Sequence, residues 1–142
     1  MDPLSITASS LAIISAIAKT SATVTKFARS VRDAREDVTA TSLQLSELSM
    51  VIDLLHNDLG DETRLPEGIR TVSVHIESVL GNCKKILVEL DTLVTTFDSR
   101  RMQWALSGKS QVVALNSRLD AHTKALQIAL DVSTLSVAHF SV

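Results

Sequence analysis

The residues most able to do chemistry include a short run, Gly108-Lys109-Ser110, that matches the end of a phosphate-binding loop. In such loops the backbone, the lysine and the hydroxyl surround the phosphates of a nucleotide, and the loop joins a strand to a helix. The motif also requires a glycine at position 103, where this chain has Gln103. We therefore predict a helix break at Gly108 and no nucleotide site.

Histidine and cysteine are the remaining candidates for metal binding or nucleophilic catalysis. The chain has one cysteine, Cys83, and four histidines, at positions 56, 75, 122 and 139. They form neither an HExxH pair nor a Cys/His spacing that holds zinc. Cys83 and His122 fall on apolar stripes, so we expect an inert buried thiol and a histidine at the edge of the core. We expect no enzyme, no metal and no cofactor, and a single cysteine fits a reducing compartment.

The elements that hold these residues are predicted to be long helices. Apolar side chains recur at alternating spacings of three and four, which is typical of the buried seam of a helix. The second segment has the seam Leu45, Leu48, Ile52, Leu55 and Leu59. The third has Ile69, Val72, Ile76, Val79, Cys83, Ile86, Leu90, Leu93 and Phe97. The last has Val112, Leu115, Leu119, His122, Leu126 and Ala129, with Leu130 on its flank.

Four such helices, joined by short connections, pack most simply as an up-and-down bundle. We predict an all-α fold: one domain over residues 1–142, forming an antiparallel helical bundle of four main helices, or five if the last is split. Trp104 should anchor one end of the bundle, and Gly81 should lie where a neighbouring helix approaches closely. The predicted boundaries are an N-cap at Asp2-Pro3, a turn over 33–37, a loop over 59–68, a turn at Asp98-Ser99 and the break at Gly108.

Charge is unevenly distributed along the chain. With 14 Lys and Arg against 16 Asp and Glu, the formal net charge is -2, so no global positive field attracts nucleic acid. Between Pro3 and Arg32 there is no acidic residue, whereas Thr41 to Glu62 contains no Lys or Arg. The N-terminal segment is therefore cationic, and the segment after it is acidic.

The N-terminal segment is also unusually apolar, since Pro3 to Ala18 carries no charge. It is too short and too rich in Ser and Thr to be a constitutive membrane span, and its start lacks the cations of a secretory signal. Alanines repeat every four residues at Ala8, Ala12 and Ala16, a spacing that lets helices approach closely. This small face is open to two interpretations: tight packing inside a soluble bundle, or helix association at a membrane.

Three stretches carry a family resemblance: MDPLSITASSLAIISAIAKTSATV, FARSVRDARED and RRMQWALSGKSQVVALNSRLDAHTKALQIAL. From Met1 to about Leu135 the chain resembles the fungal N-terminal domain of STAND proteins. This is the HeLo-like domain that precedes NACHT, ankyrin or similar modules in fungal NOD-like receptors. The resemblance rests on the combination of the MDPLS start, Trp104, Gly108-Lys109 and the pattern Leu119, His122, Leu126.

The resemblance implies a HeLo-like helical bundle, similar to the four-helix executioner domain of mixed-lineage kinase-like pseudokinases. In those relatives a regulated N-terminal region associates with membranes and kills the cell. The leading hypothesis is therefore an N-terminal effector domain of a fungal NOD-like receptor, which induces programmed cell death by oligomerisation and membrane engagement. Its expected partners are further copies of itself, anionic membrane lipids and downstream NACHT or other receptor modules. It would be cytoplasmic and relocate to the plasma membrane on activation.

In this hypothesis the first helix inserts into the membrane and its cations bind lipid headgroups. The expected membrane-insertion residues are Leu4, Ile6, Leu11, Ile13, Ile14 and Ile17. The expected headgroup ligands are Lys19, Lys26, Arg29 and Arg32, and the helix–helix small face is Ala8, Ala12 and Ala16. The alternative is a passive protein–protein interaction or oligomerisation adaptor without membrane activity.

Overall fold

The computed structural model describes residues 4–31, 34–59 and 67–141, which are almost entirely helical and, over these ranges, contain no strand. The elements in chain order are α1 (Leu4–Ser30), α2 (Arg35–Leu59), α3 (Glu67–Asp98), a short α4 (Arg101–Gln103), a π-helical turn η3 (Trp104–Gly108) and α5 (Lys109–Ser141). The all-α bundle of four long helices is thus confirmed for the described residues, and a short α4 precedes the last of them.

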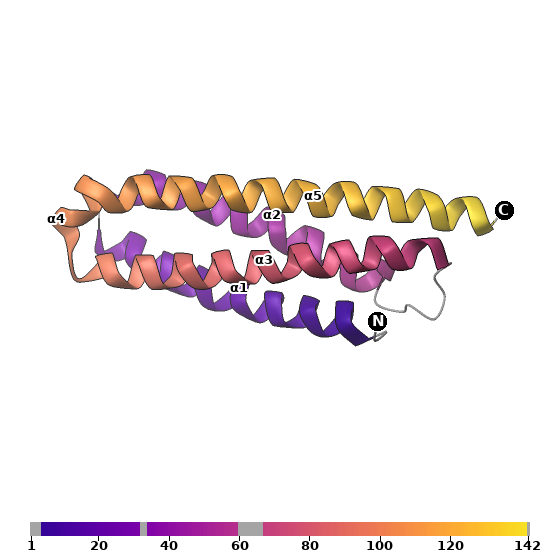
Figure 1. The fold of residues 1–142 in the computed structure, drawn as a ribbon. Coiled ribbons are helices and arrows are strands. Elements are labelled where there is room, and N and C mark those ends of the chain that lie inside the picture. The colour runs from indigo at the N-terminus through magenta and orange to yellow at the C-terminus, as the bar shows by residue number, and fades with distance from the viewer. Residues whose placement is uncertain (1–3, 32–33, 60–66, 142) are drawn as a thin grey trace.

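The four long helices form an elongated bundle in which successive helices alternate in direction (Figure 1). In the described residues α1 packs on α2 and α3, and α5 packs on the same two helices. α2 and α3 follow each other in the chain yet lie across a diagonal, so the bundle is not a simple meander. Two of its side-by-side pairs, α1 with α3 and α2 with α5, therefore run parallel.

The predicted seams form the core of this bundle. In α2, Leu45, Leu48, Ile52 and Leu55 are buried, while the side chain of Leu59 lies outside the described residues. In α3 the seam is buried from Ile76 to Phe97 except Leu93, which is partly buried like Val72; Ile69 lies outside the described side chains. In α5 the apolar seam residues are buried and His122 is half-buried, as expected for the edge of the core.

The helix boundaries agree with the sequence in part. α3 ends at Asp98, as predicted. The predicted turn over 33–37 is wrong in its second half, because α2 begins at Arg35 and residues 35–37 are helical; just before it, the Ala34 N–H donates to the Val31 carbonyl. Both ends of the predicted 59–68 loop, Leu59 and Gly68, are helical, and residues 60–66 lie outside the described part of the chain, as does the N-cap at Asp2-Pro3. The connections therefore leave nearly all described residues in helices.

The prediction of a break at Gly108 needs correction. The chain passes from α4 to α5 through a widened π-helical turn, and the Lys109 N–H donates to the carbonyl of Trp104, five residues earlier. A Cβ at Gly108 would lie 2.8 Å from Trp104 and 2.9 Å from Phe97. Glycine is required here because two aromatic rings press on the backbone, and the helix continues through it.

Trp104 anchors this end of the bundle, as predicted. Its ring packs edge-on against Phe27 of α1, with 4.8 Å between the ring centroids, and edge-on against Phe97 of α3, with 6.1 Å between the centroids. The prediction for Gly81 was wrong: it is exposed, and a Cβ there would meet nothing within 4 Å. The close backbone approach that we expected at Gly81 is instead an aromatic contact at Gly108.

Candidate interaction surfaces

The apolar residues that we expected to insert into a membrane lie on both sides of α1. Ile6, Ile13 and Ile17 are buried in the core, whereas Leu11 is 53% exposed and Ile14 is half-buried. The side chain of Leu4 lies outside the described residues. Because it is exposed, Leu11 is not a core residue of the bundle. Insertion of the whole set requires α1 to leave the bundle.

Polar side chains contribute to the attachment of α1 to α3. Thr20 donates to the Leu87 carbonyl at 3.4 Å, and the Thr23 hydroxyl lies 2.6 Å from Asp91 Oδ1. One turn from the start of the described side chains, Ser10 is fully buried, and its hydroxyl has no hydrogen-bond partner. An unpaired buried hydroxyl destabilises a folded state by about 1–3 kcal/mol, so the N-terminal half of α1 is held less well than its apolar content suggests.

The small residues of α1 lie near the rim of its buried face. Ala8 is exposed, while Ala12 and Ala16 are half-buried, and Ala16 packs against the core. Small side chains at these positions contribute little buried apolar area. The alanine row therefore offers a shallow strip on which another helix could pack closely, next to the exposed Leu11.

The cations of α1 occupy its outer face in the C-terminal half. Lys19, Lys26 and Arg29 are exposed, and none of them forms an ion pair with the described residues. Arg32, the fourth predicted headgroup ligand, lies outside the described residues. Within the described part of the chain, α1 is also the one helix that is long and apolar enough, over Ile6–Ser30, to cross a membrane. The core helix of a soluble protein meets the same criterion.

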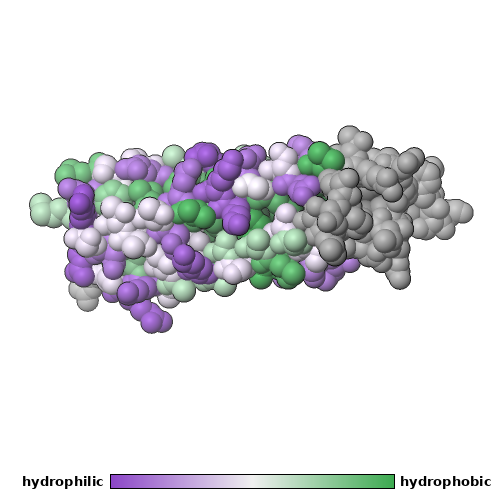
Figure 2. All heavy atoms as spheres, turned by 60° about the horizontal axis from the view of Figure 1, so that its bottom comes forward, coloured by the Kyte–Doolittle hydropathy of each residue, from purple (hydrophilic) through white to green (hydrophobic). Residues whose placement is uncertain are grey.

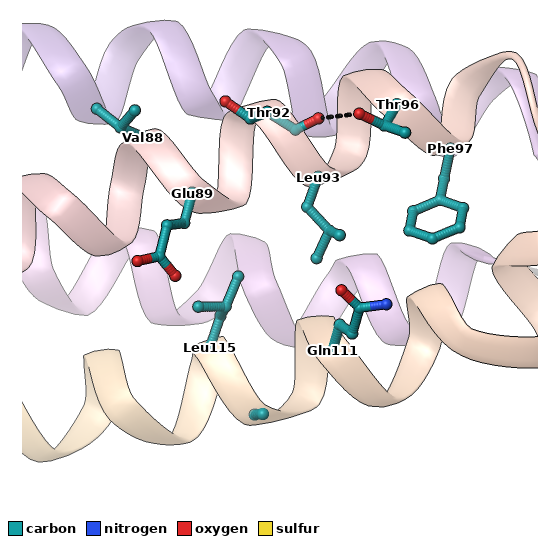
Figure 3. Close-up of a pocket in the computed structure, with 9 residues that line it drawn as sticks. Val88, Glu89, Thr92, Leu93, Thr96, Phe97, Gln111 and Leu115 are labelled. Atoms are coloured by element: carbon teal, nitrogen blue, oxygen red, sulfur yellow. Dashed lines mark hydrogen bonds between the residues drawn. The ribbon is translucent and has the colours of Figure 1, made fainter.

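A second surface is an apolar groove of about 620 Å³ between α3 and α5. Figure 3 shows Leu93 and Phe97 extending from α3 toward α5, and Leu115 extending back from α5. Glu89 lies at one end of the groove and forms an ion pair with Arg118 at 3.4 Å. Apolar spacing does not predict this groove, because Leu93 and Leu115 lie on the same stripes as the core residues.

The candidates for catalytic or metal chemistry do not come together. Cys83 is buried, and burial raises the pKa of its thiol from 9.0 to about 12, so the thiolate nucleophile is suppressed. Lys109 pairs with Asp37 of α2 at 3.7 Å, and the Ser110 hydroxyl donates to the Ser107 carbonyl at 3.0 Å, so both side chains of the loop-like motif already have partners within the bundle. No cluster of three metal-ligating side chains exists among the residues that the structure describes.

Fold and surfaces together define the chain as an all-α bundle whose notable features are interaction surfaces. No family model, no curated protein and no solved structure matches it.

Proposed function

We propose that this chain is a non-enzymatic signalling domain of the kind its sequence resembles. In this proposal it is an N-terminal effector module of a fungal NOD-like receptor that engages membranes through α1 and triggers regulated cell death. The observation that carries the proposal is the outer face of α1. Ala8, Leu11, Ser15 and Ala18 are exposed on that face, and α1 has no charged residue before Lys19. A helix that only packs in a soluble bundle normally carries charged residues on its outer face.

The proposed mechanism is release of α1 from the bundle. Once released, α1 turns Ile6, Ile13 and Ile17 from the core toward lipid hydrocarbon, together with the already exposed Leu11. Lys19, Lys26 and Arg29 then reach anionic headgroups, each contributing about 1 kcal/mol near a charged surface. The row of small residues provides a surface for self-association of released helices.

The way α1 is held supports a regulated release. Its unpaired Ser10 hydroxyl offsets part of the stabilisation that its buried isoleucines provide. α5 contacts both α2 and α3, so these two helices stay linked through α5 when α1 leaves. In the full receptor, downstream modules would control this step, and the domain would move from the cytoplasm to the plasma membrane.

The test is dye leakage from vesicles of phosphatidylcholine and phosphatidylserine. The purified chain is fused to a chemically inducible dimerisation module, because the proposed activity depends on self-association. We expect leakage on dimerisation, and we expect Leu11→Asp to reduce it roughly 30-fold, since a carboxylate at the hydrocarbon boundary costs on the order of 2 kcal/mol. Because Leu11 is exposed, the variant should fold normally by circular dichroism. Leu43→Asp, at a similarly exposed site on α2, is the matched control.

The second candidate function is a passive interaction or oligomerisation module. The apolar groove between α3 and α5 favours it, because such a groove suits an amphipathic helix of a partner. In that case the dimerised protein stays with the soluble fraction in vesicle flotation, and Leu11→Asp changes nothing that depends on lipid. Absence of both binding and leakage by the dimerised wild type would overturn the membrane proposal in favour of this one.

A further inference from the structure

We propose that the end of the bundle formed by α4 is a second membrane-docking site, which binds an anionic lipid surface while α1 is still packed. We call it the tip and define it as Arg100, Arg101, Met102 and Leu106. The tip is separate from the outer face of α1. It rests on the proposed function only in that the same membrane is the partner.

The apolar part of the tip is a protruding pair. Met102 is 84% exposed and Leu106 is 83% exposed, more than any other large hydrophobic side chain in the described residues. They lie four positions apart and flank Trp104, which is buried against Phe27. Because the π-helical turn places residues four to five apart on one side, both side chains extend from the same side of the helix.

The polar part of the tip is cationic. Arg100 and Arg101 are exposed, and within the described residues neither takes part in an ion pair. Figure 2 shows hydrophobic and hydrophilic surface side by side at the end of the molecule where α4 lies. A single exposed apolar side chain is ordinary on a protein surface. A protruding apolar pair beside two unpaired arginines matches the boundary between lipid headgroups and acyl chains.

Neighbouring helices add further positive charge at this end. The contact between Phe27 and Trp104 places the end of α1, with Lys26 and Arg29, beside the tip. α2 begins at the same end of the bundle (Figure 1), so its first residue, Arg35, is close by. Among the described residues, the acids near this end are Glu36, Asp37 and Asp98, and Asp37 is already paired with Lys109.

Charge of the opposite sign lies further along the bundle. The C-terminal half of α2, directed away from the tip, carries Glu47, Asp53 and Asp58 and neither Lys nor Arg. Asp131 lies in the corresponding half of α5. The charges are thus separated along the long axis, and a negatively charged surface would orient the bundle with the tip toward it.

An anionic membrane fits the tip better than a nucleic acid does. Phosphate backbones are contacted by polar and cationic side chains, and two protruding apolar side chains would remain in water on such a partner. At a bilayer the same side chains enter the acyl region while the arginines remain at phosphate level.

This orientation has a consequence for α1. The helix runs toward the tip, so its C-terminal end is held close to the membrane while Leu11 remains at a distance. The helix from Leu11 to Arg29 is about 27 Å long at 1.5 Å per residue. Docking by the tip therefore precedes insertion of α1. It places the C-terminal end of α1 next to the lipid, and a released α1 would turn about this end.

The test is vesicle flotation with the undimerised wild-type chain and paired variants. Arg100→Gln with Arg101→Gln should weaken binding to phosphatidylserine-containing vesicles about 30-fold, because each cation contributes roughly fivefold. Lys84→Gln with Lys85→Gln, on the exposed middle of α3, removes the same charge and should weaken it far less.

The apolar pair is tested in the same way. Met102→Gln with Leu106→Gln should weaken binding by roughly tenfold or more, in proportion to the apolar area lost from the lipid. Leu43→Gln with Met50→Gln, on the outer face of α2, is the matched control, because these side chains are 63% and 67% exposed. An environment-sensitive fluorophore on Met102→Cys should shift on binding, and one on Leu11→Cys should not, until dimerisation is induced.

The outcomes separate this inference from the proposed function. Binding that depends on the tip, without leakage on dimerisation, supports the tip and contradicts α1 insertion. If both tip variants bind vesicles and cause leakage like the wild type, the tip is not a docking site, and the proposal that α1 inserts is retained. Wild type that binds no anionic vesicle but binds DNA through the same arginines overturns the tip as a lipid site, and so does wild type that binds neither.

Discussion

Two glycines inside helices, Gly108 and Gly81, differ in the space available for a side chain. A Cβ on Gly108 would lie 2.8 Å from Trp104 and 2.9 Å from Phe97, whereas a Cβ on Gly81 would lie in open space. We predict that Gly108→Ala lowers the free energy of unfolding by about 1–3 kcal/mol, because the aromatic rings must move. Gly81→Ala should raise it by about 0.5–1 kcal/mol, because alanine favours the helix. Chemical denaturation measures both, and equal effects would contradict the difference in packing.

The buried thiol of Cys83 predicts a pH dependence. Burial raises its pKa from 9.0 to about 12 in the folded chain, so between these values the unfolded chain loses the proton and the folded chain retains it. The buried thiol's contribution to the free energy of unfolding is fully present below pH 9. It is lost as the pH rises toward 12, by up to about 1.4 kcal/mol per pH unit. Cys83→Ala should flatten this decline in denaturation curves. In native protein at pH 8, iodoacetamide should leave Cys83 unmodified, and rapid alkylation would contradict its burial.

For individual helices, the sequence predicted the buried face correctly where the apolar residues form one stripe separate from the polar residues. In α3 the seam at Ile76 and Leu90 is fully buried as expected. In α1 the same reasoning could not choose a face, because polar Ser10 and Thr20 belong to the buried stripe and apolar Leu11 lies outside it. Spacing shows a face only when polar and apolar residues segregate, and in α1 they do not.

The α3 seam makes a quantitative prediction. Ile76→Ala or Leu90→Ala should each lower the free energy of unfolding by about 2–5 kcal/mol, since each leaves a cavity in a fully buried site. Val88→Ala on the exposed side of the same helix should cost well under 1 kcal/mol. Urea denaturation checks the contrast, and a neutral change at Ile76 or Leu90 would place the wrong face of α3 in the core.

At the scale of the whole molecule, the arrangement of helices was beyond the reach of the sequence. Seams specify which side of a helix is buried, but they do not specify which helices are neighbours. α2 and α3 lie across a diagonal, and the groove between α3 and α5 exists because those two helices are adjacent instead. The surfaces available to partners therefore depend on topology, whereas the core depends on the seams.

This topology predicts which part of the molecule opens first. α1 has an unpaired buried hydroxyl at Ser10 and a row of small residues. The middle of α3, from Val79 to Leu90, packs between α1 and α5 along a continuous apolar seam, and the unpaired buried hydroxyl of α3, Ser73, lies outside that stretch. We predict that amides of Ala8 to Ala18 exchange with deuterium through a smaller opening free energy than amides of Val79 to Leu90. Ser10→Ala removes the unpaired hydroxyl and should slow exchange in α1 about fivefold, corresponding to roughly 1 kcal/mol, with little change in α3 beyond that of global unfolding.

Native-state hydrogen exchange under conditions of rapid reclosing, followed by mass spectrometry of peptides, resolves the two helices. The same Ser10→Ala variant should reduce dye leakage after dimerisation, because a better-held α1 is released less often. Equal opening free energies in α1 and α3 would mean that α1 cannot leave without unfolding the bundle. Membrane engagement through a released α1 would then require global unfolding, and the tip would be the surface through which the folded protein meets lipid.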